Sequence, residues 1–133
     1  MSSQVVEWRS YAELHPGAQH TVAGNVLVLP HLFSPQLDAA RDIVVYLPPS
    51  YSTGARRFPA IYMQDGQNLF DAATSFAGIE WQVDETLEAL SADGLEAIVV
   101  GIPHGGEHRL YEYTPPINPW WRGGGASSPP HKL

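Results

Sequence analysis

The stretch that decides the fold is FPAIYMQDGQN, at residues 58–68. Its apolar part, residues 60–64, lacks the strict alternation of a half-buried strand, which is typical of a strand covered on both faces. The Asp65-Gly66 pair that follows is a turn signal. We therefore expect a buried strand that ends in a loop.

The segments that follow predict a βαβ unit. Residues 97–102, AIVVGI, form a second run that is apolar throughout, and residues 80–90 between the two runs have a helical pattern. Four apolar residues share one face of this predicted helix: Ile79, Val83, Leu87 and Leu90. A strand, a helix and a strand in this order build a parallel pair with a right-handed crossover.

The segments that precede residue 58 predict an antiparallel pair. Residues 26–29 and 41–47 are β-rich, Pro30 ends or bends the first run, and residues 34–38 form a short turn between them. The expected fold class is α/β, with an antiparallel N-terminal strand pair followed by the parallel βαβ unit. We expect residues 1–21 to be an irregular lead-in, residues 22–117 to form the domain, and residues 118–133 to be a flexible Gly/Pro/Ser-rich tail.

Composition excludes several classes of function. The 133 residues carry a net charge of −7, so the basic footprint that nucleic-acid binding needs is missing. There is no cysteine, which excludes disulfides, Cys-based zinc sites and thiol catalysis. We find no signal-peptide pattern, no apolar run of the roughly 18 residues that span a bilayer, and no Walker or G-x-G-x-x-G motif. We expect a cytoplasmic protein without membrane association or cofactor.

Several runs, in the right order, resemble the putative esterase family of the α/β-hydrolase superfamily. The family comprises relatives of esterase D and includes feruloyl esterases, enterochelin esterases and mycolyltransferases. The resemblance covers residues 22–117. Its runs are DIVVYLPPSY at 42–51, FPAIYMQDGQNLFD at 58–71, EWQVDE at 80–85, IVVGI at 98–102, and Arg109 with EYTP at 112–115.

The resemblance implies an α/β-hydrolase fold and ester hydrolysis through a Ser-His-Asp/Glu triad. The nucleophile of such enzymes lies in a G-x-S-x-G elbow between a strand and a helix. No serine of this chain has that context: Ser2, Ser3, Ser10, Ser34, Ser50, Ser52, Ser75, Ser91, Ser127 and Ser128. We therefore expect an incomplete α/β-hydrolase sheet, the N-terminal part of a serine carboxylic-ester hydrolase. It would be inactive alone, and the substrate of the full-length parent would be a small-molecule ester.

Gln67 is the candidate catalytic residue. By resemblance to the mycolyltransferases, the residue after Asp-Gly supplies a backbone amide to the oxyanion hole. The alternative is an ordinary turn at the end of a strand. Ligands of parallel sheets bind beyond the carboxyl ends of the strands. Together with the resemblance, this rule gives the candidate substrate-binding residues: Asp65, Gly66, Asn68, Trp81, His104 and Arg109.

Other motifs have simpler interpretations. Trp81 also fits loop packing, and Arg109 binds either a substrate carboxylate or, as we favour, Glu112. HGGEH at 104–108 matches a zinc-protease string that requires a helix, whereas its glycine pair favours a loop. No metal site is predicted. The carboxylates of Glu80, Asp84 and Glu88 fit a solvated helix face better than a catalytic pair, and four histidines are expected at the surface: His15, His20, His31 and His131.

A second hypothesis treats the chain as a non-catalytic interaction or complementing fragment. In the usual sheet order of this fold, the serine-bearing strand lies beside the strand expected at residues 60–64. Without it, that strand is an apolar edge, and such edges recruit another strand. Self-association through residues 60–64 is the expected consequence.

Overall fold

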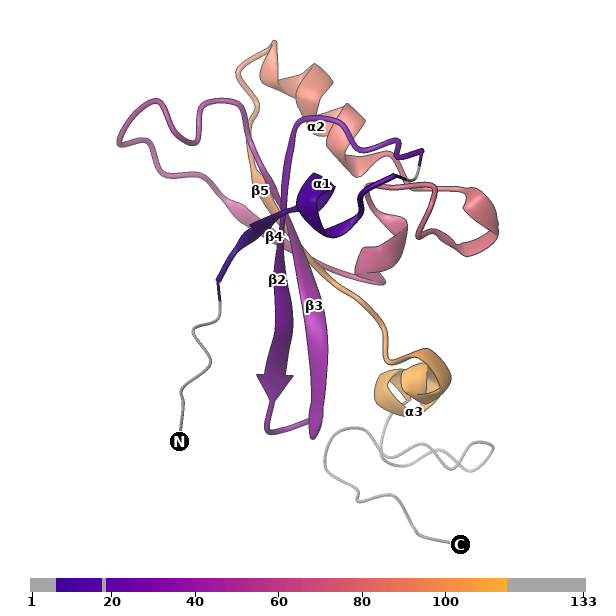
Figure 1. The fold of residues 1–133 in the computed structure, drawn as a ribbon. Coiled ribbons are helices and arrows are strands. Elements are labelled where there is room, and N and C mark those ends of the chain that lie inside the picture. Colours follow the sequence, from indigo (N-terminus) through magenta and orange to yellow (C-terminus); the bar gives the residue numbers. More distant parts are fainter. Residues whose placement is uncertain (1–6, 18, 115–133) are drawn as a thin grey trace, which may run out of the picture.

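The computed structural model describes residues 7–17 and 19–114. They contain one five-stranded sheet in the order β1-β2-β3-β5-β4, with helices beside it (Figure 1). The strands are β1 Arg9–Ser10, β2 Asn25–Ser34, β3 Ala39–Leu47, β4 Ala60–Gln64 and β5 Ile98–Ile102. The α-helices are α1 Tyr11–Leu14, α2 Val83–Ser91 and α3 Arg109–Tyr113, and the 3-10 helices are η1 Gly66–Asn68, η2 Phe76–Gly78 and η3 Gly106–His108.

The strand pairings confirm the predicted fold class. β2 and β3 are antiparallel. β4 and β5 are parallel, with Ile61 opposite Val99 and Gln64 opposite Ile102. Because the two parallel strands end side by side, the loops that follow Gln64 and Ile102 emerge at the same edge of the sheet.

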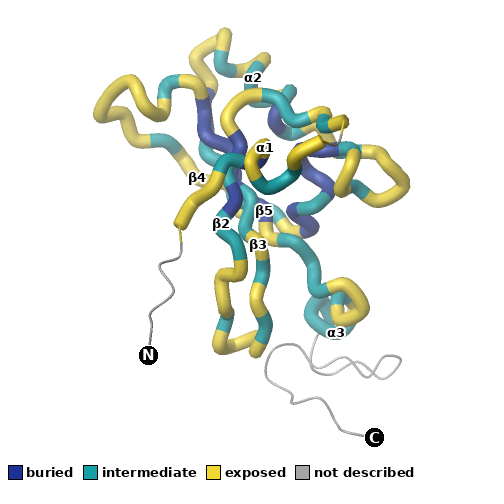
Figure 2. The backbone as a smooth tube through the Cα atoms, in the orientation of Figure 1, coloured by how far each residue is buried: buried dark blue, intermediate teal, exposed yellow. Residues whose placement is uncertain are grey.

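Pro30 bends β2 and does not end it. The strand continues to Ser34, and its register with β3 shifts between Leu29 and Leu32. His31 has a positive φ of 54° at this shift, as an irregular residue inside a strand pair allows. The β2–β3 hairpin therefore extends well beyond the rest of the sheet (Figure 1), and its tip is exposed (Figure 2).

The core lies where the sheet meets the loop after β4. Its buried residues are Tyr11, Val26, Val28, Tyr46, Leu69, Phe70 and Val99. Tyr11 belongs to α1, so the segment expected to be an irregular lead-in differs from that expectation: residues 9–14 form a short strand and one helical turn. The side chain of Tyr11, only 6 % exposed, explains why this segment is ordered. The predicted tail, residues 118–133, lies outside the described residues.

Both the apolar face and the acidic face of helix α2 differ in part from what the sequence predicts. Val83 and Leu87 pack against the core as predicted, but Ile79 precedes the helix and is 71 % exposed. The proposed solvated acidic face is wrong for Asp84, which is 0 % exposed. Its Oδ2 accepts a 2.6 Å hydrogen bond from the amide of Ala23. The segment that precedes β2 therefore covers this side of the helix.

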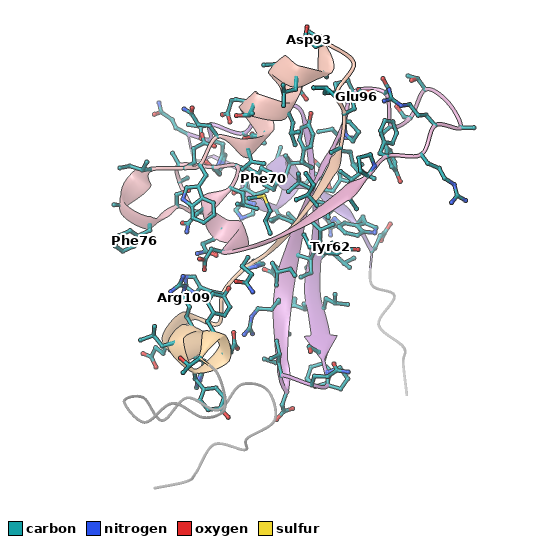
Figure 3. All side chains as sticks on the ribbon, turned by 180° about the vertical axis from the view of Figure 1, so that it is seen from behind. Tyr62, Phe70, Phe76, Asp93, Glu96 and Arg109 are labelled. Atoms are coloured by element: carbon teal, nitrogen blue, oxygen red, sulfur yellow. The ribbon has the colours of Figure 1, made fainter. Side chains whose placement is uncertain are left out.

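Strand β4 lies at the edge of the described sheet. Ile61 is 46 % and Tyr62 is 72 % exposed, and Figure 3 shows the side chain of Tyr62 away from the loop that carries Phe76. Successive side chains of a strand point to opposite faces, so the expectation of a strand covered on both faces is wrong here. Within the described residues, no helix has the length and apolar character to cross a membrane.

Candidate active site

The loop after β4 begins with a close approach between two backbones. Asp65 has a left-handed conformation, with φ 55° and ψ 45°. A Cβ atom on Gly66 would lie 2.7 Å from the carbonyl carbon of Gly101 in β5. Only glycine permits this contact, which places the 3-10 helix η1 directly against the neighbouring parallel strand.

Gln67 occupies the second position of η1, and its peptide groups are firmly placed. The amides of Asn68 and Leu69 donate to the carbonyls of Asp65 and Gly66, at 2.9 and 3.4 Å. The amide of Gln67 precedes the first of these bonds, where a helix leaves its N–H groups without an intrahelical partner. An amide at this position can donate to a group outside the helix.

Two further contacts fix Gln67. Its carbonyl accepts a 2.7 Å hydrogen bond from Thr74 Oγ1, and its side-chain Oε1 accepts one from the amide of His104, at 3.3 Å. The second contact joins the loop after β4 to the loop after β5. The two strand-end loops that the sequence singled out therefore meet at Gln67.

Asp65 pairs with Arg109 and not with solvent. The Arg109 Nε and Nη2 donate to the two carboxylate oxygens of Asp65 at 2.9 and 2.8 Å, and this pairing lowers the pKa of Asp65 below its ordinary value. The expected pair of Arg109 with Glu112 is wrong, because Glu112 pairs with Arg41 of β3. In Figure 3 the side chain of Arg109 lies between α3 and the sheet.

Asn68 braces the rest of the loop. Its Oδ1 accepts a 2.9 Å hydrogen bond from the amide of Phe76, and its carbonyl accepts one from the amide of Trp81, at 2.7 Å. The Trp81 ring is 51 % exposed, so this residue is not a core residue. Asn68 thus shapes the loop from Phe76 to Trp81 that leads into α2.

The predicted site residues line two cavities that have Gln67 in common. The larger, of about 710 Å³, brings together six of them with three apolar neighbours: Asp65, Gln67, Asn68, Trp81, His104, Arg109, Phe76, Ala77 and Ile79. The second, of about 320 Å³, is lined by Gly66 and Gln67 together with residues of α1, β2 and β3. Gln67 is common to both cavities.

The HGGEH string forms a loop and a single 3-10 turn, η3. His104 Nδ1 accepts a 2.8 Å hydrogen bond from the amide of Gly106, which fixes the imidazole within its own loop. The helix that would align His104 with His108 around a zinc ion is therefore not formed. His104 contributes to the wall of the larger cavity instead.

A buried network around Asp71 was missed by the sequence analysis. Asp71 is 1 % exposed; its Oδ2 accepts hydrogen bonds from the Tyr11 hydroxyl at 2.6 Å and from His20 Nδ1 at 2.7 Å. The expectation that His20 is a surface residue without an acidic partner is wrong. Sequence periodicity gives no signal for it, since His20 and Asp71 are 51 positions apart.

The two hydrogen-bond partners of His20 favour its imidazolium form. Its second nitrogen, Nε2, lies 2.6 Å from the carbonyl of His15. A carboxylate and a carbonyl both accept, so both ring nitrogens must donate. The hydrogen bond with Asp71 raises the pKa of His20 above its ordinary value. This network ties the N-terminal segment to the wall of the smaller cavity, which Asp71 also lines.

The strand order, the parallel β4–β5 pair and the site at their carboxyl ends define an α/β-hydrolase-type protein. The model of the family described as "Putative esterase" matches residues 34–127. The chain belongs to this esterase family.

Three known proteins are similar to it. A 76-residue stretch is 41 % identical to the "Uncharacterized protein YbbA" of Bacillus subtilis and covers 56 % of this chain and 26 % of that protein. An IroE-like serine hydrolase from Shewanella oneidensis has a TM-score of 0.52 and 25 % identity over 73 % of this chain and 31 % of its own. The BES protein from Bacillus cereus has a TM-score of 0.56 and 21 % identity over 85 % of this chain and 43 % of its own. This chain therefore spans less than half the length of each of these proteins.

Proposed function

We propose that this chain supplies the first strands and one oxyanion-hole amide of a serine ester hydrolase. The observation that carries the proposal is the placement of Gln67. Its amide precedes the first bond of η1, its carbonyl and side chain are both held, and it lines two cavities at the ends of two parallel strands. A donor fixed before the reaction stabilises a developing oxyanion without reorganisation.

The flanking residues have positioning roles in this proposal. Gly66 lets η1 approach β5, Asn68 braces the loop toward Trp81, and Asp65 holds Arg109. Arg109, Trp81 and His104 then remain as cavity walls that contact the alcohol or acyl part of a small-molecule ester. A paired Arg109 binds a substrate carboxylate only if it leaves Asp65, so an uncharged ester is the better fit.

The nucleophile and the base belong to polypeptide outside these 133 residues in this account. Without them no acyl-enzyme forms. The purified chain is therefore expected to leave p-nitrophenyl acetate unhydrolysed and to remain unlabelled by a fluorophosphonate, which modifies activated serines. Labelling that maps to one of its serines would contradict the proposal.

A second function, strand complementation, is favoured by the exposed edge at β4. Ile61 and Tyr62 lie on opposite faces of this edge and both are largely exposed. An added strand would pair with the free backbone groups of β4 and cover its apolar side chains. The occupant is a second copy of this chain or the nucleophile-bearing segment of an esterase.

Sedimentation velocity tests this second function. We expect the wild-type chain to form larger species as its concentration rises and Tyr62→Lys to shift it toward the monomer, because an edge lysine opposes strand addition. Tyr51→Lys, at another exposed tyrosine that lies outside the strands, is the matched control. A wild-type chain that stays monomeric at high concentration would rule out self-association.

A further inference from the structure

Three carboxylates converge at the start of helix α2, apart from the site described above. One oxygen each of Glu80, Asp84 and Glu85 lies within 4.8 Å of the others. Asp84 is 0 % exposed, and the other two are partly buried. Three of their oxygen atoms, Glu80 Oε2, Asp84 Oδ1 and Glu85 Oε2, are buried without a hydrogen-bond partner among the described residues.

The other oxygens of two of these carboxylates are anchored to the segment that precedes β2. Asp84 Oδ2 accepts a 2.6 Å hydrogen bond from the amide of Ala23, and Glu80 Oε1 accepts one from the hydroxyl of Thr21. These bonds fix the side chains and leave Glu80 Oε2 and Asp84 Oδ1 buried without a partner among the described residues. One oxygen of each of these two carboxylates is thus held by the protein, and the other is available to bind an ion.

In the part of the chain that the structure describes, no ion pair joins a basic side chain to this cluster. The ion pairs of residues 7–17 and 19–114 involve other acids: Glu13, Asp42, Asp65, Asp71, Glu96 and Glu112. Burying like charges together is unfavourable unless an opposite charge or protons compensate.

We propose that Glu80, Asp84 and Glu85 bind one divalent cation, and that Ca²⁺ fits them best. Carboxylate oxygens are the ligands of hard cations. Ca²⁺ takes six to eight oxygen ligands in a flexible geometry, whereas Mg²⁺ demands near-ideal octahedral geometry and keeps most of its waters. Three carboxylates held close together therefore suit Ca²⁺, and water completes its coordination because Glu80 and Glu85 are only partly buried.

The proposed ion has a structural effect and takes no part in ester chemistry. Through Glu80 and Asp84 it joins α2 and the loop before it to Thr21 and Ala23. Removing the ion leaves like charges in contact at the junction of these segments. Bound Ca²⁺ therefore stabilises the folded chain by mass action, whether or not the proposed oxyanion role of Gln67 holds.

Two direct readouts test the site. Tb³⁺ replaces Ca²⁺, and its luminescence is excited through a nearby indole; Trp81 immediately follows Glu80. We expect sensitised Tb³⁺ emission that Ca²⁺ displaces and Mg²⁺ displaces less well. We also expect millimolar Ca²⁺ to raise the melting temperature of the chelator-treated protein.

The decisive variants are Asp84→Asn and Glu85→Gln, with Asp93→Asn, in the exposed turn that follows the same helix, as the control for loss of one charge. The two cluster variants should weaken Ca²⁺ binding about ten-fold or more. Without Ca²⁺ they should melt no lower than the wild type, since a repulsion has been removed. The proposal is overturned by the absence of a Ca²⁺-dependent melting shift and of Tb³⁺ emission, or by equal Ca²⁺ responses in Glu85→Gln and Asp93→Asn.

Discussion

At the residue scale, Gly66 is the position with the least freedom. A Cβ atom there would lie 2.7 Å from the backbone of Gly101 and 2.8 Å from the amide nitrogen of Ile102. Neither backbone atom can move without displacing β5. We expect Gly66→Ala to lower the free energy of unfolding by about 1–3 kcal/mol, the usual cost of overpacking.

Urea denaturation measures this cost, and Gly54→Ala is the matched control. A Cβ atom on Gly54 has no neighbour within 4 Å, so that change should leave stability equal or slightly higher. Equal destabilisation by both substitutions would show that the contact between η1 and β5 is not tight.

The His20–Asp71 pair gives a pH dependence with a defined sign. The pKa of His20 is raised, so its contribution to stability is complete below its unfolded value of about 6.5 and is lost as pH rises through the folded pKa. The pKa of Asp71 is lowered, so its contribution is complete above about 4 and is lost in acid. Tyr11 stays protonated throughout, because burial raises its pKa.

The pair should therefore stabilise the fold most between about pH 4 and about pH 6.5. We expect the difference in unfolding free energy between wild type and His20→Ala to be larger at about pH 5.5 than at about pH 9. His31→Ala, at an exposed histidine, is the matched control. A His20→Ala effect that grows toward alkaline pH would contradict the assigned imidazolium.

Single residues also mark the limit of sequence-based prediction. The turn at Asp65-Gly66 could be predicted because it depends on neighbours in the chain. The partners of Arg109, Asp84 and His20 could not, because each depends on segments brought together by the fold: Asp65, Ala23 and Asp71 respectively. A sequence shows only the neighbours of these charged residues along the chain, whereas their actual partners are distant in sequence.

At the element scale, α3 is held to the sheet by two ion pairs. Arg109 binds Asp65 and Glu112 binds Arg41, and the guanidinium of Arg109 also lies over the Tyr113 ring at 4.9 Å. Because Arg109 is partly exposed, solvent screens its pair, and we expect Arg109→Ala to have only a small effect on global stability.

The local effect of this change should be larger than the global one. Hydrogen exchange of residues 109–113 should accelerate in Arg109→Ala, and Arg109→Lys should restore it only in part, because lysine lacks the two-pronged contact. Arg9→Ala, which breaks the exposed pair with Glu13, should leave exchange at 109–113 unchanged. Unaltered protection of α3 in Arg109→Ala would show that the pair does not hold the helix.

The elements themselves could largely be predicted. β4 matches the expected residues 60–64, and β5 begins one residue later than expected. The errors have physical causes: Gln82 has a left-handed conformation and delays the start of α2 to Val83, and Pro30 is accommodated at a shift in register. Both are local backbone irregularities that hydrophobic periodicity does not detect.

At the scale of the whole molecule, the strand order explains both proposed functions. Crossing from β4 through α2 to β5 puts β5 between β3 and β4 and leaves β4 at the edge of the described sheet. The same crossing brings the loops after Gln64 and Ile102 together around Gln67. The site and the uncovered edge are thus consequences of one topology.

The central claim is that the backbone amide of Gln67 stabilises an oxyanion for a nucleophile supplied by other polypeptide. The direct measurement is ester hydrolysis by a chimera in which this chain replaces the matching segment of the IroE-like serine hydrolase from Shewanella oneidensis. Gln67→Pro removes the amide hydrogen, whereas Gln67→Ala keeps it. We predict that Gln67→Pro lowers kcat about 10²–10³-fold while Gln67→Ala retains most of it. Equal kcat values for the two variants, both folded by thermal melting, or no turnover by the folded parent chimera, would contradict the claim.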